Sequence, residues 1–483
     1  MRLTGIQRIV GLLIVLSSLT MLPPAAVSLF YQDGSAAAFL EGFALLAVLG
    51  TVLWWPVRKH RYDLRIRDGF IVVVACWFVL GLSGAVPLLM SPDPTMSVTD
   101  AVFESISALT TTGATVLQGI DFLPPAIQFY RQMLQWLGGM GIVVLAVAVL
   151  PMLRIGGMQL YRAETPGPMK DNKLTPRITE TAKALWYLYL GLTVVCAAAY
   201  WLAGMSFFDA ICHAFSTIAI GGFSTHDQSI GFFNNPAIEL IAVFFMIVAG
   251  VNFALHFMAW RRATMAPYMA DPELKAYLWI LLVGVVVCTL GLLHAGQYDG
   301  VGSALRYGLF QVVSAATTTG FSTDSFYLWP SALPLLLLLL SCIGACAGST
   351  GGGIKVIRGL LLYRQGIREI TRLIHPAVVN PIKIGGKTMN EKVIQSVWGF
   401  FSLYVAMFCL LSLVLTFLGL DLTTAVSAVL SCLNNLGPAL GEAGPHYADL
   451  NDPAKWFLAF AMIMGRLELF TLLVILSPVF WRN

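Results

Sequence analysis

Four short stretches of this sequence combine a glycine with backbone that could bind a cation. They lie at residues 110–114, 219–223, 317–321 and 434–438, and they read Thr-Thr-Thr-Gly-Ala, Ala-Ile-Gly-Gly-Phe, Thr-Thr-Thr-Gly-Phe and Asn-Asn-Leu-Gly-Pro. Glycine adopts backbone angles that strain other residues, so a strand through it can present successive carbonyl oxygens on one side. Such oxygens replace the water shell of a monovalent cation in ion selectivity filters. The predicted chemistry is therefore cation coordination by backbone.

Further features repeat when the four stretches are aligned on their glycines. The glycines are roughly a hundred residues apart, and a serine precedes each by six residues, at Ser107, Ser216, Ser314 and Ser431. Because the side chains differ between copies, backbone oxygens are the expected ligands. The predicted ligand positions are Thr111, Thr112 and Gly113; Ile220, Gly221 and Gly222; Thr318, Thr319 and Gly320; and Asn435, Leu436 and Gly437. The alternative, glycine turns between packed helices, is disfavoured by four copies in register.

The composition indicates a protein that crosses a membrane many times. Of its 483 residues, 58% are hydrophobic and only 11% are charged, too little charge to cover a soluble protein of this size. Ten apolar segments come close to the roughly twenty residues needed to span hydrocarbon. They run at about 6–30, 36–56, 69–90, 126–153, 182–204, 236–260, 275–295, 331–363, 394–419 and 454–480.

The positions of the glycine stretches between these segments predict an all-α membrane protein. We expect two leading transmembrane helices, followed by four repeats of helix, short pore helix, loop and helix around a pseudo-fourfold pore. The expected boundaries are 1–68 for the leading helices and 69–153, 154–260, 261–363 and 364–483 for the repeats. The carboxyl ends of the pore helices would point at the centre, where their partial negative charge favours a cation. Asp100 and Asp209 stand about where a helix N-cap is expected.

The lysines and arginines predict the orientation of the chain. They crowd into segments 57–68, 154–183, 261–275 and 355–392, whereas the segments with the glycine stretches hold only Arg131, Arg306 and Lys455. Since basic residues favour the cytoplasmic side, both termini and the crowded loops are expected there. The glycine stretches then enter from outside.

The eighth apolar segment is interrupted by a glycine-rich run. Residues 344–355 include Gly348, Ser349, Thr350, Gly351, Gly352 and Gly353. A phosphate-binding loop is excluded, because Ile354 stands where that motif requires lysine and no β-strand precedes it. A kink between packed helices is one interpretation, and a flexible gate across the pore beneath the filter is the favoured one. Arg466, an ionisable residue inside the tenth segment, could bond the freed carbonyls of this run.

These four stretches, with the two leading helices and Gly-Gly-Phe-Ser-Thr-His-Asp at 221–227, resemble the bacterial Trk/Ktr and plant HKT cation transporters, and most of all the membrane subunits of the Trk systems. The resemblance covers essentially the whole chain. It implies potassium uptake across the bacterial inner membrane, an intramembrane gate loop, and a homodimer. It also implies a cytoplasmic TrkA-like ring that binds the regulatory nucleotide. We expect the basic residues of 154–183 and 355–392, Arg368 among them, to form the surface that contacts this ring. Ala439, where a smaller residue is expected, is a minor departure.

Other functions leave weaker signals in the sequence. A potassium symporter coupled to protons or sodium would use Glu104 or His213 as a relay, although scaffold hydrogen bonding is favoured for both. We find no nucleophile, zinc or paired-carboxylate motif of an enzyme, and the eight cysteines show no metal-ligand spacing. We therefore expect no cofactor in this chain, potassium as substrate at the filter positions, membrane lipid around the protein, and no nucleic acid.

Overall fold

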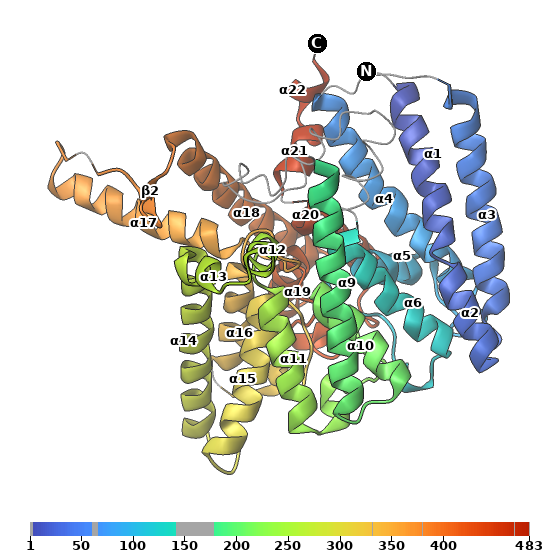
Figure 1. Ribbon diagram of the computed structural model, residues 1–483, viewed down its shortest axis with the longest axis horizontal. Coiled ribbons are helices and arrows are strands. Elements are labelled where there is room, and N and C mark those ends of the chain that lie inside the picture. The colour runs from blue at the N-terminus through green and yellow to red at the C-terminus, as the bar shows by residue number, and fades with distance from the viewer. Residues whose placement is uncertain are drawn as a thin grey trace.

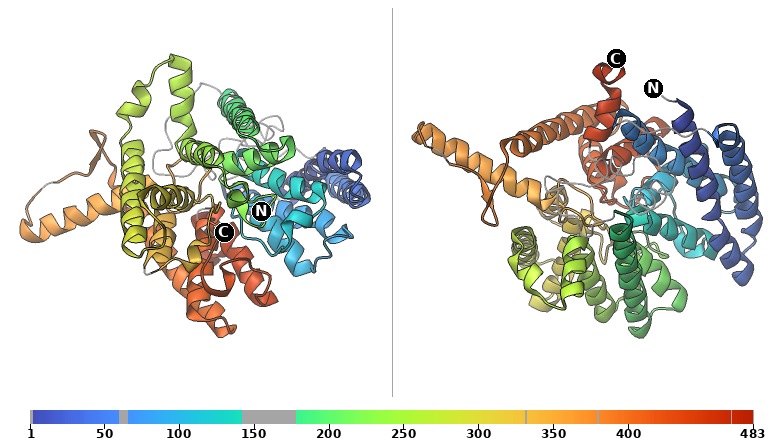
Figure 2. Two further views of the ribbon diagram at one scale, coloured as in Figure 1. Left: turned by 90° about the horizontal axis from the view of Figure 1, so that it is seen from below. Right: turned by 45° about the horizontal axis from the view of Figure 1, so that its top comes forward.

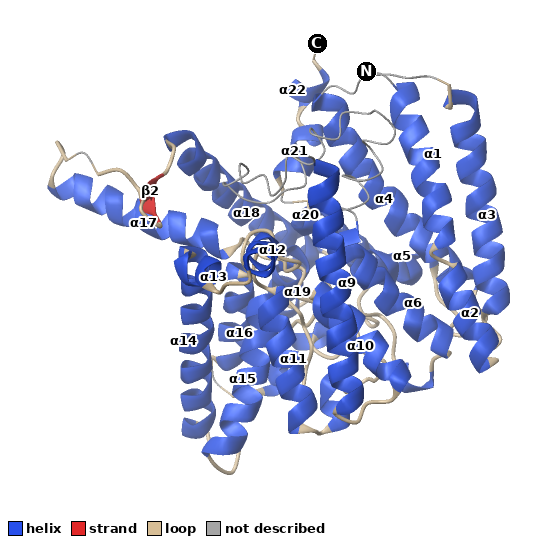
Figure 3. Ribbon diagram, viewed as in Figure 1, coloured by secondary structure: helices blue, strands red, loops and turns tan. Residues whose placement is uncertain are grey.

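The computed structural model describes residues 3–59, 66–141, 178–330, 332–378, 380–467 and 469–482. Within these ranges the chain is mostly helical (Figure 1 and Figure 3). The one sheet in the described part is a small antiparallel hairpin of β1 (Lys383–Ile384) and β2 (Lys387–Thr388), which the sequence analysis did not predict. The prediction of a helical membrane protein is confirmed, since several helices are long and apolar enough to cross a bilayer.

The leading helices pack closely against each other. The first is broken into α1 (Leu3–Leu19) and α2 (Leu22–Tyr31), and the second is α3 (Ala36–Trp54), extended by the 3₁₀ turn Trp55–Val57. Glycines permit the close approach of α1 and α3. A Cβ on Gly11 would lie 2.8 Å from the backbone nitrogen of Trp54, and one on Gly50 would lie 2.8 Å from the Gly11 carbonyl oxygen. Small residues have this role at many helix contacts in membranes.

The first two repeats follow the predicted order of helix, pore helix and helix. Repeat 1 consists of α4 (Ile66–Met90), the pore helix α5 (Val98–Leu109), the 3₁₀ turn Ile120–Phe122, α6 (Pro125–Trp136) and a π-helical turn at Leu137–Gly141. Repeat 2 consists of α9 (Ile178–Leu202), the pore helix α10 (Phe207–Ala219), the 3₁₀ turn Ser229–Phe233, α11 (Pro236–Ala249) and α12 (Phe253–Arg262), followed by α13 (Ala266–Ala270).

The last two repeats have the same plan with longer additions. Repeat 3 consists of α14 (Pro272–His294), the pore helix α15 (Val301–Thr317), the 3₁₀ turn Phe326–Leu328, α16 (Leu333–Ile343) and α17 (Val356–Ile374). Repeat 4 consists of α18 (Glu391–Phe417), the pore helix α19 (Leu422–Asn434), the 3₁₀ turn Gly441–Ala443, α20 (Asp452–Arg466), α21 (Phe470–Leu476) and α22 (Pro478–Trp481). Seen from below, the four repeats follow one another around a common centre (Figure 2).

The spans differ from the ten predicted. In the described part, six helices are long and apolar enough to cross a membrane, with α1 and α2 counted together as one. The count rises to eight if each of two bent helix pairs is taken as one span. The bend is 92° between α11 and α12 and 115° between α20 and α21. The predicted fourth span leaves the described residues after Gly141. The predicted eighth span ends as a helix at Ile343, and its second half is amphipathic α17, which extends away from the body (Figure 1).

Candidate functional site

The four predicted stretches share one backbone conformation at the ends of their pore helices. Two residues before the glycine, the backbone of each stretch is left-handed, with φ of 54° at Thr111, 56° at Ile220, 66° at Thr318 and 56° at Asn435. The aligned glycines are left-handed too, with φ of 80°, 79°, 84° and 97° at Gly113, Gly222, Gly320 and Gly437. Non-glycine residues rarely take positive φ. Because this uncommon pattern occurs in all four stretches, the four turns are copies of one structural motif.

The repeated serine closes each pore helix through its backbone. The carbonyl oxygen of Ser107 accepts from the Thr112 N–H at 2.9 Å, and the same bond recurs in the other repeats at 2.8, 2.8 and 2.9 Å, from Gly221 to Ser216, Thr319 to Ser314 and Leu436 to Ser431. This bond satisfies a carbonyl that a helix end leaves without a partner. The serine repeat is visible in the sequence, but the bond that each serine makes is not.

The four turns close into a ring. A Cβ built on Gly113 would lie 2.2 Å from the Gly221 carbonyl oxygen, and one on Gly222 would lie 2.1 Å from that of Thr319. A Cβ on Gly320 would lie 2.1 Å from the Leu436 oxygen, and one on Gly437 would lie 2.5 Å from the Thr112 oxygen. In each repeat, therefore, the glycine contacts the carbonyl of the residue before the next repeat's glycine. A side chain at any of the four would displace a neighbouring carbonyl.

The N-termini of the pore helices correct one detail of the sequence analysis. The N-caps of α5 and α10 are Ser97 and Ser206, whose hydroxyls accept from the backbone N–H of Asp100 and Asp209. The two aspartates were expected near the N-cap itself. They stand in the third helical position instead, where each carboxylate accepts from the hydroxyl of its N-cap serine and favours the positive end of the helix.

Polar residues on three pore helices hold the strands that follow the glycines. Glu104 accepts from the Thr115 hydroxyl and the Val116 N–H, both at 3.0 Å. His213 Nε2 lies 2.9 Å from the Ser224 hydroxyl. In the third repeat the Gln311 amide donates to the Ser322 hydroxyl at 3.2 Å. These contacts favour the scaffold interpretation of Glu104 and His213 over a proton relay.

The three basic residues of the glycine-bearing segments are all in ion pairs. Arg131 Nε lies 2.7 Å from Glu104, Arg306 lies 2.6 Å from Glu239, and Lys455 Nζ lies 2.7 Å from Asp100. The Arg131–Glu104 pair is buried, with 1% and 0% of the side chains exposed, and the guanidinium lies 4.2 Å from the centroid of the Phe223 ring. In the sequence, these residues indicated only the orientation of the chain in the membrane. Their acidic partners neutralise the positive charge near the ring.

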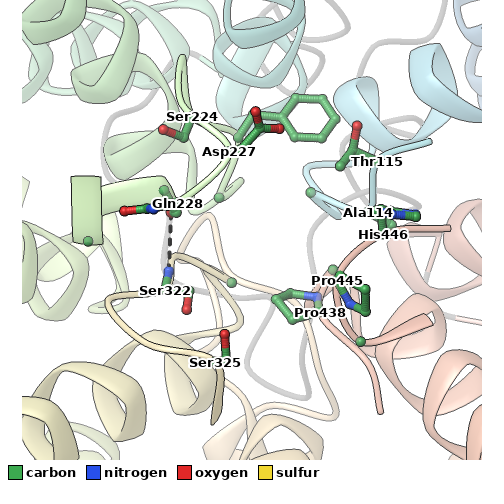
Figure 4. Close-up of a pocket in the computed structure, with 18 of the residues that line it drawn as sticks. Ala114, Thr115, Ser224, Asp227, Gln228, Ser322, Ser325, Pro438, Pro445 and His446 are labelled. Carbon is green, nitrogen blue, oxygen red and sulfur yellow. Dashed lines mark hydrogen bonds between the residues drawn. The ribbon is translucent and has the colours of Figure 1, made fainter. Parts of the chain in front are cut away.

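A cavity of about 450 Å³ adjoins the ring and is lined by all four repeats (Figure 4). His226 stands on its wall and bridges two repeats. One ring nitrogen contacts the Asp121 carboxylate of repeat 1, and the other lies 3.6 Å from Asp209 on α10. Burial alone would lower the pKa of His226, but hydrogen bonding and the charges of Asp209 and Asp121 outweigh it and raise the pKa above its ordinary value.

The glycine-rich run at residues 344–355, which contains the predicted gate residues 348–353, lies against the ends of three pore helices. The Thr350 hydroxyl donates to the Ile218 carbonyl at 3.0 Å, and the Gly353 N–H donates to the Asn434 carbonyl at 3.0 Å. The Gly352 N–H donates to the Thr318 hydroxyl at 2.7 Å. The run therefore lies beneath the ring at repeats 2, 3 and 4. A Cβ on Gly352 would lie 2.0 Å from the Asn434 oxygen, so this contact requires glycine.

Charged side chains fix the same run from other elements. Arg466 donates to the Thr350 carbonyl at 3.0 Å and to the carbonyls of Gly138 and Gly139 at 2.8 and 3.0 Å. Glu273 accepts from the backbone N–H of Ala347 at 2.8 Å and of Ile357 at 3.1 Å. The Arg466 contact was expected from the sequence, but the Glu273 contacts were not, because nothing in the sequence relates the start of α14 to a run more than seventy residues later.

The comparisons with known proteins agree with this fold. The profile of the TrkH family, described as cation transport proteins, matches residues 35–482. The chain belongs to the TrkH family of cation transport proteins. It is 56% identical to the Trk system potassium uptake protein TrkH of Vibrio parahaemolyticus, with both chains covered in full, and 42% identical to TrkG of Escherichia coli over 98% of this chain and 97% of that one. The crystal structure of the potassium transporter TrkH from Vibrio parahaemolyticus superposes with a TM-score of 0.91 over 100% of both chains at 53% identity.

Membership of the TrkH family confirms two predictions. The family consists of membrane transporters, so the chain is a multi-pass transport protein and not an enzyme. In the described residues there is no group of three or more histidine, cysteine, aspartate or glutamate side chains arranged to hold a metal ion.

Proposed function

We propose that this protein takes up potassium across the bacterial inner membrane through the ring of glycine turns, which acts as a selectivity filter. The observation that carries the proposal is the closed ring, in which the oxygens of Thr112, Gly221, Thr319 and Leu436 stand in equivalent places. Dehydrated potassium is coordinated by such carbonyl oxygens in known filters. Relatives that match the whole chain are named potassium uptake proteins.

The pore helices support a cation at this place. The helices α5, α10, α15 and α19 end at the residues of the ring, and the partial negative charge of a helix carboxyl end favours a cation. Arg131, Arg306 and Lys455 are each paired with a carboxylate, which limits their repulsion of an entering ion. The proposed metal site is therefore a site for the transported ion, formed by the predicted backbone positions.

The run Gly348 to Gly353 is the proposed gate. Its hydrogen bonds to Ile218, Thr318 and Asn434 hold it across the path beneath the filter. Arg466 anchors it and adds a positive charge. A potassium ion about 5 Å from this guanidinium would meet a repulsion of roughly 3 kcal/mol at an effective dielectric of about 20. Opening then requires the run and Arg466 to move together.

Transport through a gated conduit is favoured over coupled symport. A proton relay needs groups that are free to exchange protons, whereas Glu104 is held by Arg131, Thr115 and Val116. His213 is held between the Asp209 carbonyl at 2.8 Å and the Ser224 hydroxyl at 2.9 Å. These bonds support roles in positioning the filter strands, with the membrane potential as driving force.

The proposed partners are a second copy of the chain and a cytoplasmic TrkA-like ring that binds the nucleotide. The helix α17 leaves the body and exposes apolar side chains, among them Tyr363, Ile370 and Leu373, a surface that a second copy would cover. Arg364 and Arg372 are exposed on the same helix and could contact the ring. Of the second basic segment expected at this surface, 154–183, residues 154–177 lie outside the described residues.

The proposed topology has both termini in the cytoplasm. Helix α1 begins and α22 ends on the same side of the molecule (Figure 1). The proposal as a whole is tested with purified protein in liposomes, by measuring ion flux with potassium or sodium as the only permeant cation. Flux with potassium well above flux with sodium is expected. Equal rates for the two ions would contradict a potassium filter.

A further inference from the structure

The strand of repeat 2 lacks a support that repeats 1 and 3 contain. In repeat 1 the hydroxyls of Thr110 and Thr112 are 2.8 Å apart, and in repeat 3 those of Thr317 and Thr319 are 2.8 Å apart. Each pair ties the residue before the glycine to the end of its pore helix. Repeat 2 has Ala219 and Gly221 at these two places and can make no such bond. Its two consecutive glycines also give it the least restricted backbone of the four.

A glutamine from repeat 1 occupies the vacant place. The Gln135 side chain is fully buried near the end of α6. Its Nε2 donates to the Gly221 carbonyl oxygen at 2.5 Å, and its Oε1 accepts from the Phe223 N–H at 3.1 Å. The two hydrogen bonds hold the backbone in place on either side of Gly222. Both ends of the amide are satisfied in this orientation, which fixes the direction of the side chain.

The glycine at position 221 and Gln135 fit each other. A Cβ on Gly221 would lie 2.4 Å from Gln135 Cδ and 2.5 Å from Oε1, and these amide atoms are the nearest that it would meet. The backbone at 221 is not left-handed, so the backbone alone would accept alanine there. Glycine is therefore required at position 221 because the Gln135 amide fills the space that a side chain would occupy.

We propose that Gln135 is a specificity-determining residue, which fixes the Gly221 carbonyl oxygen in the ring that selects the transported ion. The inference rests on the proposed filter function. The Gly221 oxygen has the same relation to Gly113 that the other three oxygens have to their neighbouring glycines. A carbonyl oxygen has two lone pairs and can accept the amide while it faces an ion. Without the amide, this quarter of the ring is free to turn, and the ring loses its discrimination between ions of different size.

The experiment measures the potassium-over-sodium permeability ratio from reversal potentials in liposomes. Gln135→Leu removes both hydrogen bonds, and we expect the ratio to fall by roughly three- to tenfold, the effect of one net buried hydrogen bond. Gln135→Met serves if the leucine variant does not fold. The matched control is Gln132→Leu, because Gln132 is equally buried on the same helix and neither of its amide atoms has a hydrogen-bond partner in the described part. The control should keep the wild-type ratio.

A double substitution tests the fit between the two residues. Gly221→Ala should lower thermal stability, and in a Gln135→Ala background the same change should cost much less, because the clashing amide is gone. Neither background should recover the wild-type ratio. Equal costs of Gly221→Ala in both backgrounds would mean that the amide does not occupy this space, and would overturn the inference.

Gly320→Ser separates failure of the inference from failure of the filter. If Gly320→Ser lowers the ratio and Gln135→Leu does not, the filter stands and the role of Gln135 is overturned. If Gln132→Leu lowers the ratio as much as Gln135→Leu, the effect belongs to general packing and the inference also fails. If neither Gly320→Ser nor Gln135→Leu changes the ratio, the ring is not the selective element, and both proposals fall.

Discussion

The Arg466 guanidinium donates a hydrogen bond from Nη1 to the carbonyl oxygen of Thr350, 3.0 Å away, and so ties helix α20 to the run beneath the filter. Its Nη2 donates to the carbonyls of Gly138 and Gly139 in the π-helical turn after α6. One side chain thus joins three elements that are distant in sequence. The same turn follows Gln135, which holds the filter strand of repeat 2. The anchor of the gate and a support of the filter therefore stand on neighbouring turns of one helix.

Removal of this anchor should release the gate. We expect Arg466→Ala to raise potassium flux without the regulatory ring by about tenfold or more, since hydrogen bonds from a charged group contribute roughly 1.5–3 kcal/mol. The measurement is potassium flux in liposomes that contain the transporter alone. Arg262→Ala removes the same charge from an exposed position and should leave flux unchanged. Basal flux in folded Arg466→Ala protein would mean that the run is a packing kink.

A side chain on a filter glycine should damage selectivity. Gly320 has φ of +84°, and a Cβ there would lie 2.1 Å from the Leu436 carbonyl oxygen, so Gly320→Ser strains its own backbone and displaces its neighbour. We expect the potassium-over-sodium permeability ratio to fall, and Gly113→Ser to act alike. Gly302→Ser is the control, because a Cβ at Gly302 has no heavy atom within 4 Å. Wild-type ratios in both filter variants would argue against a carbonyl ring.

The surface for the regulatory ring can be separated from the structural arginines of α17. Arg364 and Arg372 are exposed, whereas Arg368 is 4% exposed and donates two hydrogen bonds to Glu391, at 3.0 and 2.7 Å. Arg364→Glu with Arg372→Glu should weaken co-purification of the ring and lower thermal stability only slightly, because the ion pair of Arg372 with Glu369 is exposed and contributes little. Arg368→Glu should instead lower stability, because it places two carboxylates together. Retention of the ring by the double variant would remove this surface from the proposal.

The His226 bridge should make the outer mouth sensitive to pH. The pKa of His226 is raised by its two carboxylates, so the bridge contributes fully to stability below the ordinary histidine pKa of about 6.5. That contribution is lost as pH rises through the raised pKa in the folded protein. We expect the difference in thermal unfolding temperature between the wild type and His226→Gln to shrink from pH 6 to pH 9. A difference that stays constant or grows would contradict a charged bridge.

The features found from the sequence are those that the chain repeats. Four glycines and four serines in register predicted the turns, because each turn is built from residues within one short segment. Arg466 was found because a charge inside an apolar helix requires a partner. In both cases the local sequence contains the constraint.

The features missed depend on contacts between distant segments. Gln135 and Gly221 are 86 residues apart, and only the fold brings an unremarkable glutamine to the filter. Arg368 was expected on the partner surface but is buried against Glu391, because α17 and α18 pack together. The eighth span was missed for a different reason, since its pattern is local: after the glycines the charged and apolar residues lie on opposite faces of an amphipathic helix, α17, which leaves the body.

The central claim, a potassium-selective conduit, is tested most directly by reversal potentials of the purified transporter in liposomes with its gate released by Arg466→Ala. With a fixed potassium gradient, we expect the reversal potential to follow the potassium equilibrium potential and to stay there when a proton or sodium gradient is added. A reversal potential that shifts with either added gradient would contradict the conduit and assign coupled symport instead.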